Sequence, residues 1–321
     1  MSIDTPVGAR PSGRFFVILI NVVIALISIN AYPDDRVYIQ VLGITQDAGY
    51  PQAGCYQPHC MKGWEDAGAR RLTSSIAVVD ERHHVKYLFD ATPDMREQLY
   101  QLHVAAPDGQ FDLGGVFLTH GHIGHYTGLM HFGHEAMGAK GVPVYAMPRM
   151  RDFLASNGPW DQLIAYKNIE LRPLESDAPV SLPGQITVTP FLVPHRDEYT
   201  EAVGFRIDGP DKSAVFIPDI DKWERWDTDI RAVIRSVDYA LLDAAFFADG
   251  ELPGRDMSKI PHPFVAESMA YFDGLSDEEK SGVVFIHMNH TNPLLFEDSD
   301  ESAIVEKRGY RVAREGLRLD L

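Results

Sequence analysis

The sequence predicts one large α/β domain in which short strands are interspersed with helices. With 321 residues, the chain is long enough to bury a sizeable core. Hydrophobic residues make up 45% of the chain and its charges are dispersed, which excludes a disordered protein. Runs rich in β-branched and aromatic residues recur between turn signals, as expected for strands.

The balance of charge limits the partners. The chain has 46 acidic and 29 basic residues, a formal net charge of -17. Such a negative charge repels the phosphate backbone of nucleic acid, so nucleic acid is not an expected partner. It also provides no electrostatic attraction to anionic lipid. We expect a small-molecule substrate instead.

The N-terminal residues 1–31 have the pattern of a targeting segment. Arg10 and Arg14 precede an apolar run over residues 15–29, and Ala31 offers a cleavage point. The run is shorter than the roughly 20 residues that a spanning helix prefers, although an uncleaved anchor and a buried helix remain alternatives. Cleaved or anchored, residues 32–321 would form an exported domain, periplasmic or held at the membrane outside the cytoplasm. Contact with a membrane is expected only from an uncleaved anchor.

Cys55 and Cys60 are the only two cysteines. In an exported chain an even count favours a local disulfide, because the compartment is oxidising. A small structural zinc site that also uses His59 is the alternative, but it leaves the fourth ligand position unfilled.

The elements follow one another in an α/β order. The first half predicts strands over residues 36–44, 74–80, 85–91, 114–120 and 142–147, and helices over residues 92–103 and 125–138. The second half predicts strands over residues 186–195, 203–208, 213–219, 239–247 and 282–290.

Histidine and aspartate recur where these strands end. Three histidines follow the strand over residues 114–120, and the same two residue types recur at later strands: His120, His122, His125, His195, Asp219, Asp243, His287 and His290. Imidazole and carboxylate groups at the ends of neighbouring strands can converge on one divalent cation, and zinc prefers that mixture of nitrogen and oxygen. Unconnected surface histidines are the alternative interpretation.

The stretch "THGHIGH" at residues 119–125 resembles the His-x-His-x-Asp-His motif of the metallo-β-lactamase superfamily. The resemblance implies a four-layer αββα sandwich with a metal site at one edge of two packed sheets. The segments "QDAGYP", "VPHRDEYTEAVGF", "LLDAAFF", "PHPF" and "HMNHTNP" resemble the branch that contains the pyrroloquinoline quinone (PQQ) biosynthesis B proteins. This likeness extends over residues 36–321.

The resemblance also implies the ligands. A first metal would be held by His120, His122 and His195 with Asp219 as a bridge, and a second by His125, His287 and the other oxygen of Asp219. Asp221 could exchange roles with Asp219. Asp90 would orient the histidine loop, because ligand imidazoles usually donate their other N–H to a fixed acceptor; a helix cap is its alternative role. Zinc is the expected metal, with iron or manganese as alternatives.

Gly124 stands where the motif carries its aspartate. The second metal would therefore lose one anionic ligand, so we expect one tightly held metal and a second that is weakly held or absent. An aspartate introduced at position 124 is expected to raise the metal content, unless the backbone there requires a positive φ.

The expected activity follows from the metal. A bound cation activates water, so the leading expectation is hydrolysis of an ester, lactone, amide or phosphodiester. His262 or His290 is the expected proton donor to the leaving group. The resemblance to the PQQ biosynthesis B proteins implies an iron-dependent oxidoreductase as the alternative, and a non-catalytic metal-binding relative is a second alternative.

Overall fold

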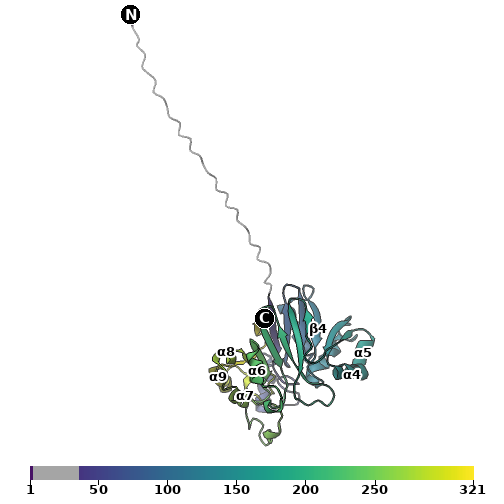
Figure 1. Cartoon of the computed structure of the whole chain (residues 1–321), viewed down its shortest axis with the longest axis vertical. Helices are drawn as coiled ribbons and strands as arrows, with labels where there is room; N and C mark the ends of the chain where they lie inside the picture. Colours follow the sequence, from purple (N-terminus) through teal and green to yellow (C-terminus); the bar gives the residue numbers. More distant parts are fainter. Residues whose placement is uncertain (3–35) are drawn as a thin grey trace. The chain divides into compact units, whose positions relative to one another are not determined.

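The structure, a computed structural model, describes residues 1–2 and 36–321 (Figure 1). The predicted targeting segment lies outside the described residues except for its first two, so its cleavage and the exported location remain predictions. No helix in the described part of the chain is long and apolar enough to cross a membrane.

Two seven-stranded sheets form the centre of the folded unit (Figure 1). The first sheet has the order β14-β1-β2-β3-β4-β5-β6, and β3 to β6 run parallel to one another. Its strands are β1 (Val37–Gly43), β2 (Ser75–Asp80), β3 (Val85–Phe89), β4 (Asp112–Phe117), β5 (Val142–Ala146), β6 (Ile169–Pro173) and β14 (Arg318–Asp320).

The second sheet has the order β13-β12-β11-β10-β9-β8-β7. Strands β10 to β13 run parallel, so the carboxyl ends of these strands share one edge. Its strands are β7 (Val180–Leu182), β8 (Ile186–Leu192), β9 (Val203–Asp208), β10 (Ser213–Ile217), β11 (Tyr239–Asp243), β12 (Val283–Ile286) and β13 (Arg311–Val312).

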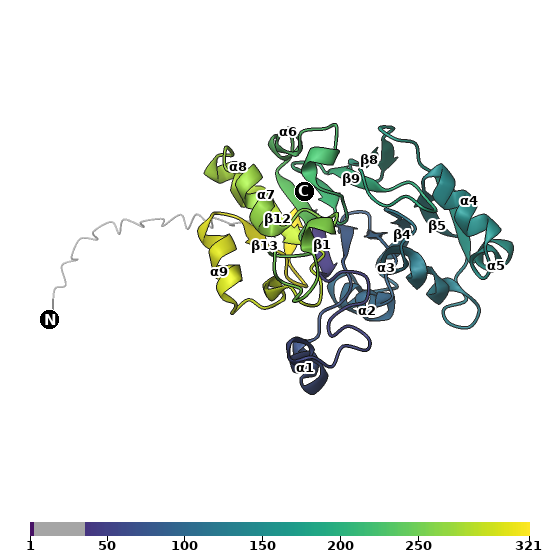
Figure 2. The same cartoon turned by 90° about the horizontal axis from the view of Figure 1, so that it is seen from below.

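Helices cover the outer faces of both sheets, with α4 and α5 beside the first sheet and α6 to α9 beside the second (Figure 2). The helices are α1 (Pro58–Glu65), α2 (Met95–Ala105), α3 (Ile123–Tyr126), α4 (Pro148–Ser156), α5 (Trp160–Ala165), α6 (Ile230–Arg235), α7 (Val265–Tyr271), α8 (Asp277–Gly282) and α9 (Asp300–Lys307). Short 3₁₀ turns are η1 (Ala67–Ala69), η2 (Thr127–Phe132), η3 (Trp223–Arg225), η4 (Met257–Lys259) and η5 (Pro293–Leu295).

Strand β1 shows why the sandwich has four layers. Ile39 and Val41 pack in the core shared by the two sheets. Tyr38 and Leu42 point the other way, into a second core that includes Leu102 of α2. Successive side chains of a strand face opposite sides of the sheet, and every residue of β1 is buried, so the strand is covered on both faces. The predicted αββα sandwich is confirmed.

The predicted helix over residues 125–138 is wrong in length. The structure has only the four residues of α3, followed by the 3₁₀ turn η2. The backbone is diverted here, because the N–H of Gly128 donates to the carbonyl of Ala91 at 2.9 Å and the N–H of Ala91 donates to the carbonyl of His125 at 2.9 Å. This close approach requires glycine, since a Cβ at position 128 would lie 2.2 Å from the carbonyl oxygen of Thr92. The chain then turns at Gly138, whose φ of +55° suits a residue without a side chain.

Phe117 lies at the centre of the shared core, fully buried and stacked on Tyr145 at a centroid distance of 4.2 Å. Replacing Phe117 by alanine should lower the free energy of unfolding by about 3–5 kcal/mol, because the cavity cannot close completely. Tyr100, 69% exposed on α2, is the control, and Tyr100→Ala should change stability by less than about 1 kcal/mol. Denaturant unfolding measures both, and equal effects would contradict the packing described.

Candidate metal centre

Except for His290, the predicted site residues come together at one edge of the sandwich, where strands from both sheets end. Each lies at or just beyond the carboxyl end of its strand: Asp90 after β3, His120 after β4, His195 after β8, Asp219 after β10, Asp243 at the end of β11 and His287 after β12. Because the parallel strands end at a common edge, residues far apart in sequence meet there. Helix α3 adds His125 and begins directly after His122.

The first cluster contains His120, His122, His195 and Asp219. Nε2 of His195 lies 3.2 Å from Oδ2 of Asp219 and 3.3 Å from Nδ1 of His122. Nε2 of His120 lies 3.4 Å from the same Asp219 oxygen. Ligand atoms bonded to zinc at about 2.0–2.1 Å in a tetrahedron lie roughly 3.3–3.4 Å apart. Nε2 of His120 lies closer to Nδ1 of His122, at 2.9 Å. The four donor atoms are therefore near enough to one another to share one zinc ion, with all of them within 4.8 Å of each other.

The second cluster contains Asp47, His125 and His287. Nε2 of His125 lies 3.8 Å from Asp219 Oδ2, the oxygen that also faces His120 and His195. The expectation that the other oxygen of Asp219 would serve the second metal is wrong, since Oδ1 lies 3.3 Å from His262 instead. One Asp219 oxygen thus lies between the two clusters.

Sequence reasoning missed Asp47. It lies in the loop after β1, 77 positions before Gly124, and carries no strand-end signal. The one available signal was Gly124. Because it stands where the motif carries an aspartate, another part of the chain could have been expected to supply that carboxylate.

Asp90 has the predicted orienting position. Its buried carboxylate accepts hydrogen bonds from the backbone N–H of Thr119 at 2.8 Å and from its hydroxyl at 2.9 Å. Nδ1 of His125 donates to Asp90 Oδ2 at 2.7 Å. These bonds fix the His125 ring with Nε2 free for another partner. Asp90 also lies at a φ of +67°, so it ends the strand rather than capping a helix.

Asp221 does not exchange places with Asp219. Its Oδ1 lies 3.4 Å from Nδ1 of His195, on the side of the ring opposite to Nε2, and its Oδ2 pairs with Arg225 at 2.7 Å. Asp221 therefore supports His195 from behind.

His262 meets the cluster from a loop before α7. Its Nδ1 donates to Asp243 Oδ2 at 2.7 Å, and the ring is almost fully buried. Asp243 is itself fixed, because it accepts backbone hydrogen bonds from Ile220 at 3.1 Å and Ala245 at 2.8 Å. His262 is thus held in one orientation beside Asp219, as a predicted proton donor must be.

The electrostatics favour a cation. Burial opposes ionisation of Asp219, but His195 and His262 outweigh it and hold the pKa of the carboxyl well below its usual range. Burial lowers the pKa of His120 well below its usual value, and His125 lowers it further. For His262, burial is outweighed by Asp243 and Asp219, which raise its pKa to about 9. For His195, burial is outweighed by Asp219, which raises its pKa to about 10. Asp219 is thus an ionised carboxylate that a cation can share with His195 once the cation displaces the imidazole proton.

Unpartnered buried atoms supply the test of fit. Nε2 of His125, both ring nitrogens of His287 and Oδ1 of Asp47 are buried without a hydrogen-bond partner. Since such atoms cost free energy unless something binds them, and since they lie in the same clusters, the residues fit a bound divalent cation.

His290, the other nominated proton donor, lies elsewhere. Its ring is 5.5 Å from that of His59, and it completes a group with Cys55, His59 and Cys60. Cys55 and Cys60 are joined by a disulfide, as predicted. The zinc alternative for this group lacked a fourth ligand in the sequence, and His290 occupies that position in space. The nomination of His290 as proton donor is therefore not supported by its position.

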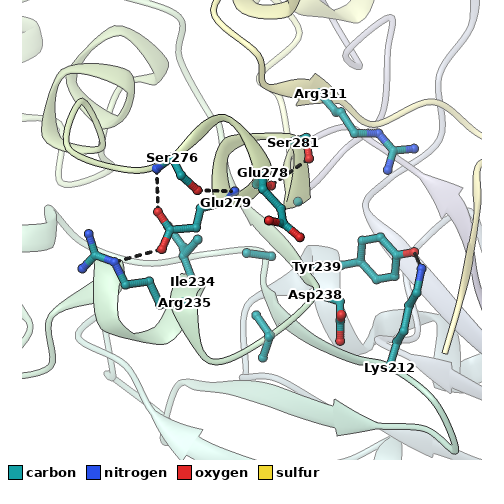
Figure 3. A pocket seen from close by; sticks show the side chains of 13 residues that line it. Lys212, Ile234, Arg235, Asp238, Tyr239, Ser276, Glu278, Glu279, Ser281 and Arg311 are labelled. Carbon is teal, nitrogen blue, oxygen red and sulfur yellow. Dashed lines mark hydrogen bonds and ion pairs between the residues drawn. The ribbon is translucent and has the colours of Figure 1, made fainter.

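Two cavities need to be told apart. One of about 410 Å³ adjoins the metal centre and is lined by Gln46, Asp47, Gln52, Arg196, Phe246, Arg255, Ile260, Pro261, His262 and Asn289. A larger one of about 640 Å³ lies where β10 to β13 begin, at the opposite end of these strands (Figure 3). Among its charged side chains, Arg235 pairs with Glu279 at 3.1 Å, and the cavity lies far along the strands from the histidine and aspartate clusters. The smaller cavity is the candidate substrate site.

Sequence relatives extend over almost the whole chain. The coenzyme PQQ synthesis protein B of Methylobacterium sp. (strain 4-46) is 28% identical over 310 residues, which cover 88% of this chain and 99% of that protein. The protein of the same name from Methylorubrum extorquens (strain PA1) is 29% identical over 310 residues, covering 88% of this chain and all of that protein.

Solved structures that resemble this one include a protein from the same group as the sequence relatives. The Zn²⁺-bound PqqB of Methylobacterium extorquens matches with a TM-score of 0.72 at 26% identity, covering 88% of this chain and 100% of that one. A diphosphatase from the PhnP family matches with a TM-score of 0.62 at 23% identity over 89% of this chain and 97% of that one, a likeness of fold alone. The family described as "Beta-lactamase superfamily domain" matches residues 86–288, more than half of the chain. With this match and the histidine and aspartate clusters, the chain belongs to the metallo-β-lactamase superfamily, as its histidine motif predicted.

Proposed function

We propose that the protein is a zinc-dependent hydrolase whose substrate is a small phosphodiester. The observation that carries the proposal is the first cluster, in which donor atoms of His120, His122, His195 and Asp219 all lie within 4.8 Å of one another. When bound, the metal supplies an activated water and polarises the phosphoryl oxygen. The remaining steps are carried out by side chains of the protein.

His262 is the proposed proton donor. Asp243 holds its Nδ1, so Nε2 is the ring nitrogen left to move a proton to the leaving oxygen. The same histidine lines the candidate substrate cavity. Its place between the metal ligands and the cavity suits a leaving group that departs on the cavity side.

Two arginines narrow the substrate class. Arg196 and Arg255 both line the candidate substrate cavity. The chain as a whole is strongly acidic, yet this cavity is lined by two guanidinium groups, of which Arg196 also pairs with Glu198 at 3.5 Å. Among the ester, lactone, amide and phosphodiester classes, only the phosphodiester is itself an anion. Guanidinium groups bind phosphate oxygens well.

An iron-dependent oxidoreductase is the second candidate. The observation that favours it is the similarity to the PQQ synthesis B proteins over nearly their full length. Imidazole and carboxylate ligands also suit iron(II). A need for dioxygen separates the two candidates: the hydrolase turns over equally well with and without it.

The metal ligands can be tested singly. His120→Ala, His122→Ala and His195→Ala should each remove most of the tightly held zinc and lower the hydrolysis rate by at least 100-fold, since each deletes a ligand. His134→Ala is the matched control, because His134 is exposed and stacks on Tyr166 away from the cluster. Elemental analysis after dialysis gives the zinc content. Zinc retention by His195→Ala at the level of the unaltered protein would refute the assignment.

Replacement of His262 should separate catalysis from metal binding. His262→Ala is expected to lower kcat by about 10²–10⁴-fold through the loss of proton transfer, with little change in zinc content. A substrate whose leaving group needs no proton, such as a nitrophenyl phosphodiester, should show a much smaller loss than an alkyl one. Equal losses on the two substrates would rule out the proton-donor role.

The arginines should govern substrate binding. Arg196→Ala combined with Arg255→Ala is expected to raise KM for a phosphodiester about tenfold, because charged hydrogen bonds to the phosphate are lost. KM for a neutral aryl ester should stay within about twofold. Arg231→Ala, which removes an exposed arginine paired with Asp229, is the control. An unchanged KM for the phosphodiester in the double variant would contradict the proposed substrate class.

A further inference from the structure

Asp47 fills the space into which a side chain at position 124 would project. A Cβ added to Gly124 would lie 2.5 Å from the Cα of Asp47 and 2.7 Å from its Oδ1. Real Cβ atoms do not approach other atoms this closely, so any side chain at position 124 would displace the loop that carries Asp47. Gly124 is not among the described residues with positive φ, so crowding rather than backbone conformation is what requires glycine.

We propose that Asp47 is the carboxylate ligand of the second metal position, in place of the aspartate that the histidine motif carries at position 124. The inference rests on the proposed metal-dependent function and names a ligand for it. The Asp47 carboxylate stands where a side chain from position 124 would project, so the carboxylate of the motif is supplied by a different part of the chain.

The donor atoms converge. Oδ1 of Asp47 lies 3.8 Å from Nε2 of His125, and one donor atom from each of Asp47, His125 and His287 lies within 4.8 Å of the others. Oδ1 of Asp47 is buried without a hydrogen-bond partner, although 46% of the side chain is exposed. His287 is fully buried, and neither ring nitrogen has a hydrogen-bond partner, although Nδ1 lies 3.9 Å from Oδ1 of Asp243. Three facing side chains whose donor atoms lack a hydrogen-bond partner are what a cation would bind.

The Asp47 loop is held in place on both sides. Before Asp47, the N–H of Gln46 donates to the carbonyl of Met288 at 2.8 Å, and the N–H of Met288 donates to the carbonyl of Ile44 at 2.8 Å. After it, the N–H of Tyr50 donates to the carbonyl of Arg71 at 2.8 Å. Met288 directly follows His287, so the same backbone bonds position both ligands.

Backbone conformation supports the same conclusion. Asp47 has a φ of +32° and His287 a φ of +68°, which are costly for residues with a Cβ. Such conformations persist where the surrounding structure imposes them, and they gather at functional sites. With Asp47 and the shared Asp219, the second position has two carboxylates, so it should hold its metal more firmly than the sequence alone predicts.

The test is the zinc content of the full chain after extensive dialysis, measured with the metal alone. The unaltered protein should retain two equivalents per chain. Asp47→Asn, which keeps the shape but removes the charge, should retain one, and so should His287→Ala. Asp249→Asn is the control, since Asp249 is exposed and its carboxylate accepts only from the N–H of Gly250 among the described hydrogen bonds.

The outcomes separate this inference from the proposed function. Two equivalents in Asp47→Asn would overturn the role of Asp47 and leave the hydrolase intact, as would a single equivalent in the unaltered protein. No zinc in the unaltered protein would overturn both. A crystal structure of the zinc-loaded protein gives the direct reading: an Asp47 oxygen at about 2.0–2.2 Å from the second metal supports the inference, and a larger separation refutes it.

The variant Gly124→Ala tests the role of Asp47 by changing the residue against which the Asp47 loop packs. The new methyl group should displace the Asp47 loop and remove the second equivalent, while the first cluster keeps its zinc. By the same reasoning, the expectation that Gly124→Asp raises the metal content is revised: it should lower it. Two equivalents in Gly124→Ala would mean that the loop does not need its present position to hold the metal.

Discussion

A buried carboxylate encircled by imidazoles governs the arrangement of the site. Oδ2 of Asp219 lies within 3.8 Å of nitrogens from His120, His125 and His195. Taking a charge out of water is expensive unless partners replace the lost hydration, so Asp219 can be buried only if these side chains gather around it. They come from both sheets, and only the edge where the strands end brings them within reach. The ligand side chains therefore reach Asp219 only when the two sheets are packed together, so the site depends on the packing of the sandwich.

The α/β order of the elements was predictable from local signals, because strand ends marked by His120, His195 and Asp219 can be read from hydrophobic periodicity. The four-layer sandwich and the grouping of the ligands in the first cluster were implied by the resemblance of the histidine motif to the metallo-β-lactamase superfamily. Asp47 could not be found this way, since its place depends on backbone bonds to Met288, more than 240 positions away. His290 has the same local signal as His287, but the chain turns after β12 and carries it to His59.

Fold alone does not decide the reaction. Two of the similar proteins share the sandwich but have different functions, one a coenzyme PQQ synthesis protein and one a diphosphatase. What favours hydrolysis here is local: both histidines of the His-x-His motif in the first cluster, a fixed His262 beside it, and arginines at the cavity. A redox site would need no proton donor aimed at a leaving group.

The origin of the oxygen atom that enters the product tests the central claim most directly. Turnover of a phosphodiester in ¹⁸O-labelled water should give a phosphomonoester that carries one labelled oxygen, with the same yield under nitrogen as in air. Label that enters instead from ¹⁸O₂, or turnover that stops without dioxygen, would contradict hydrolysis and identify the site as that of an oxygen-dependent enzyme.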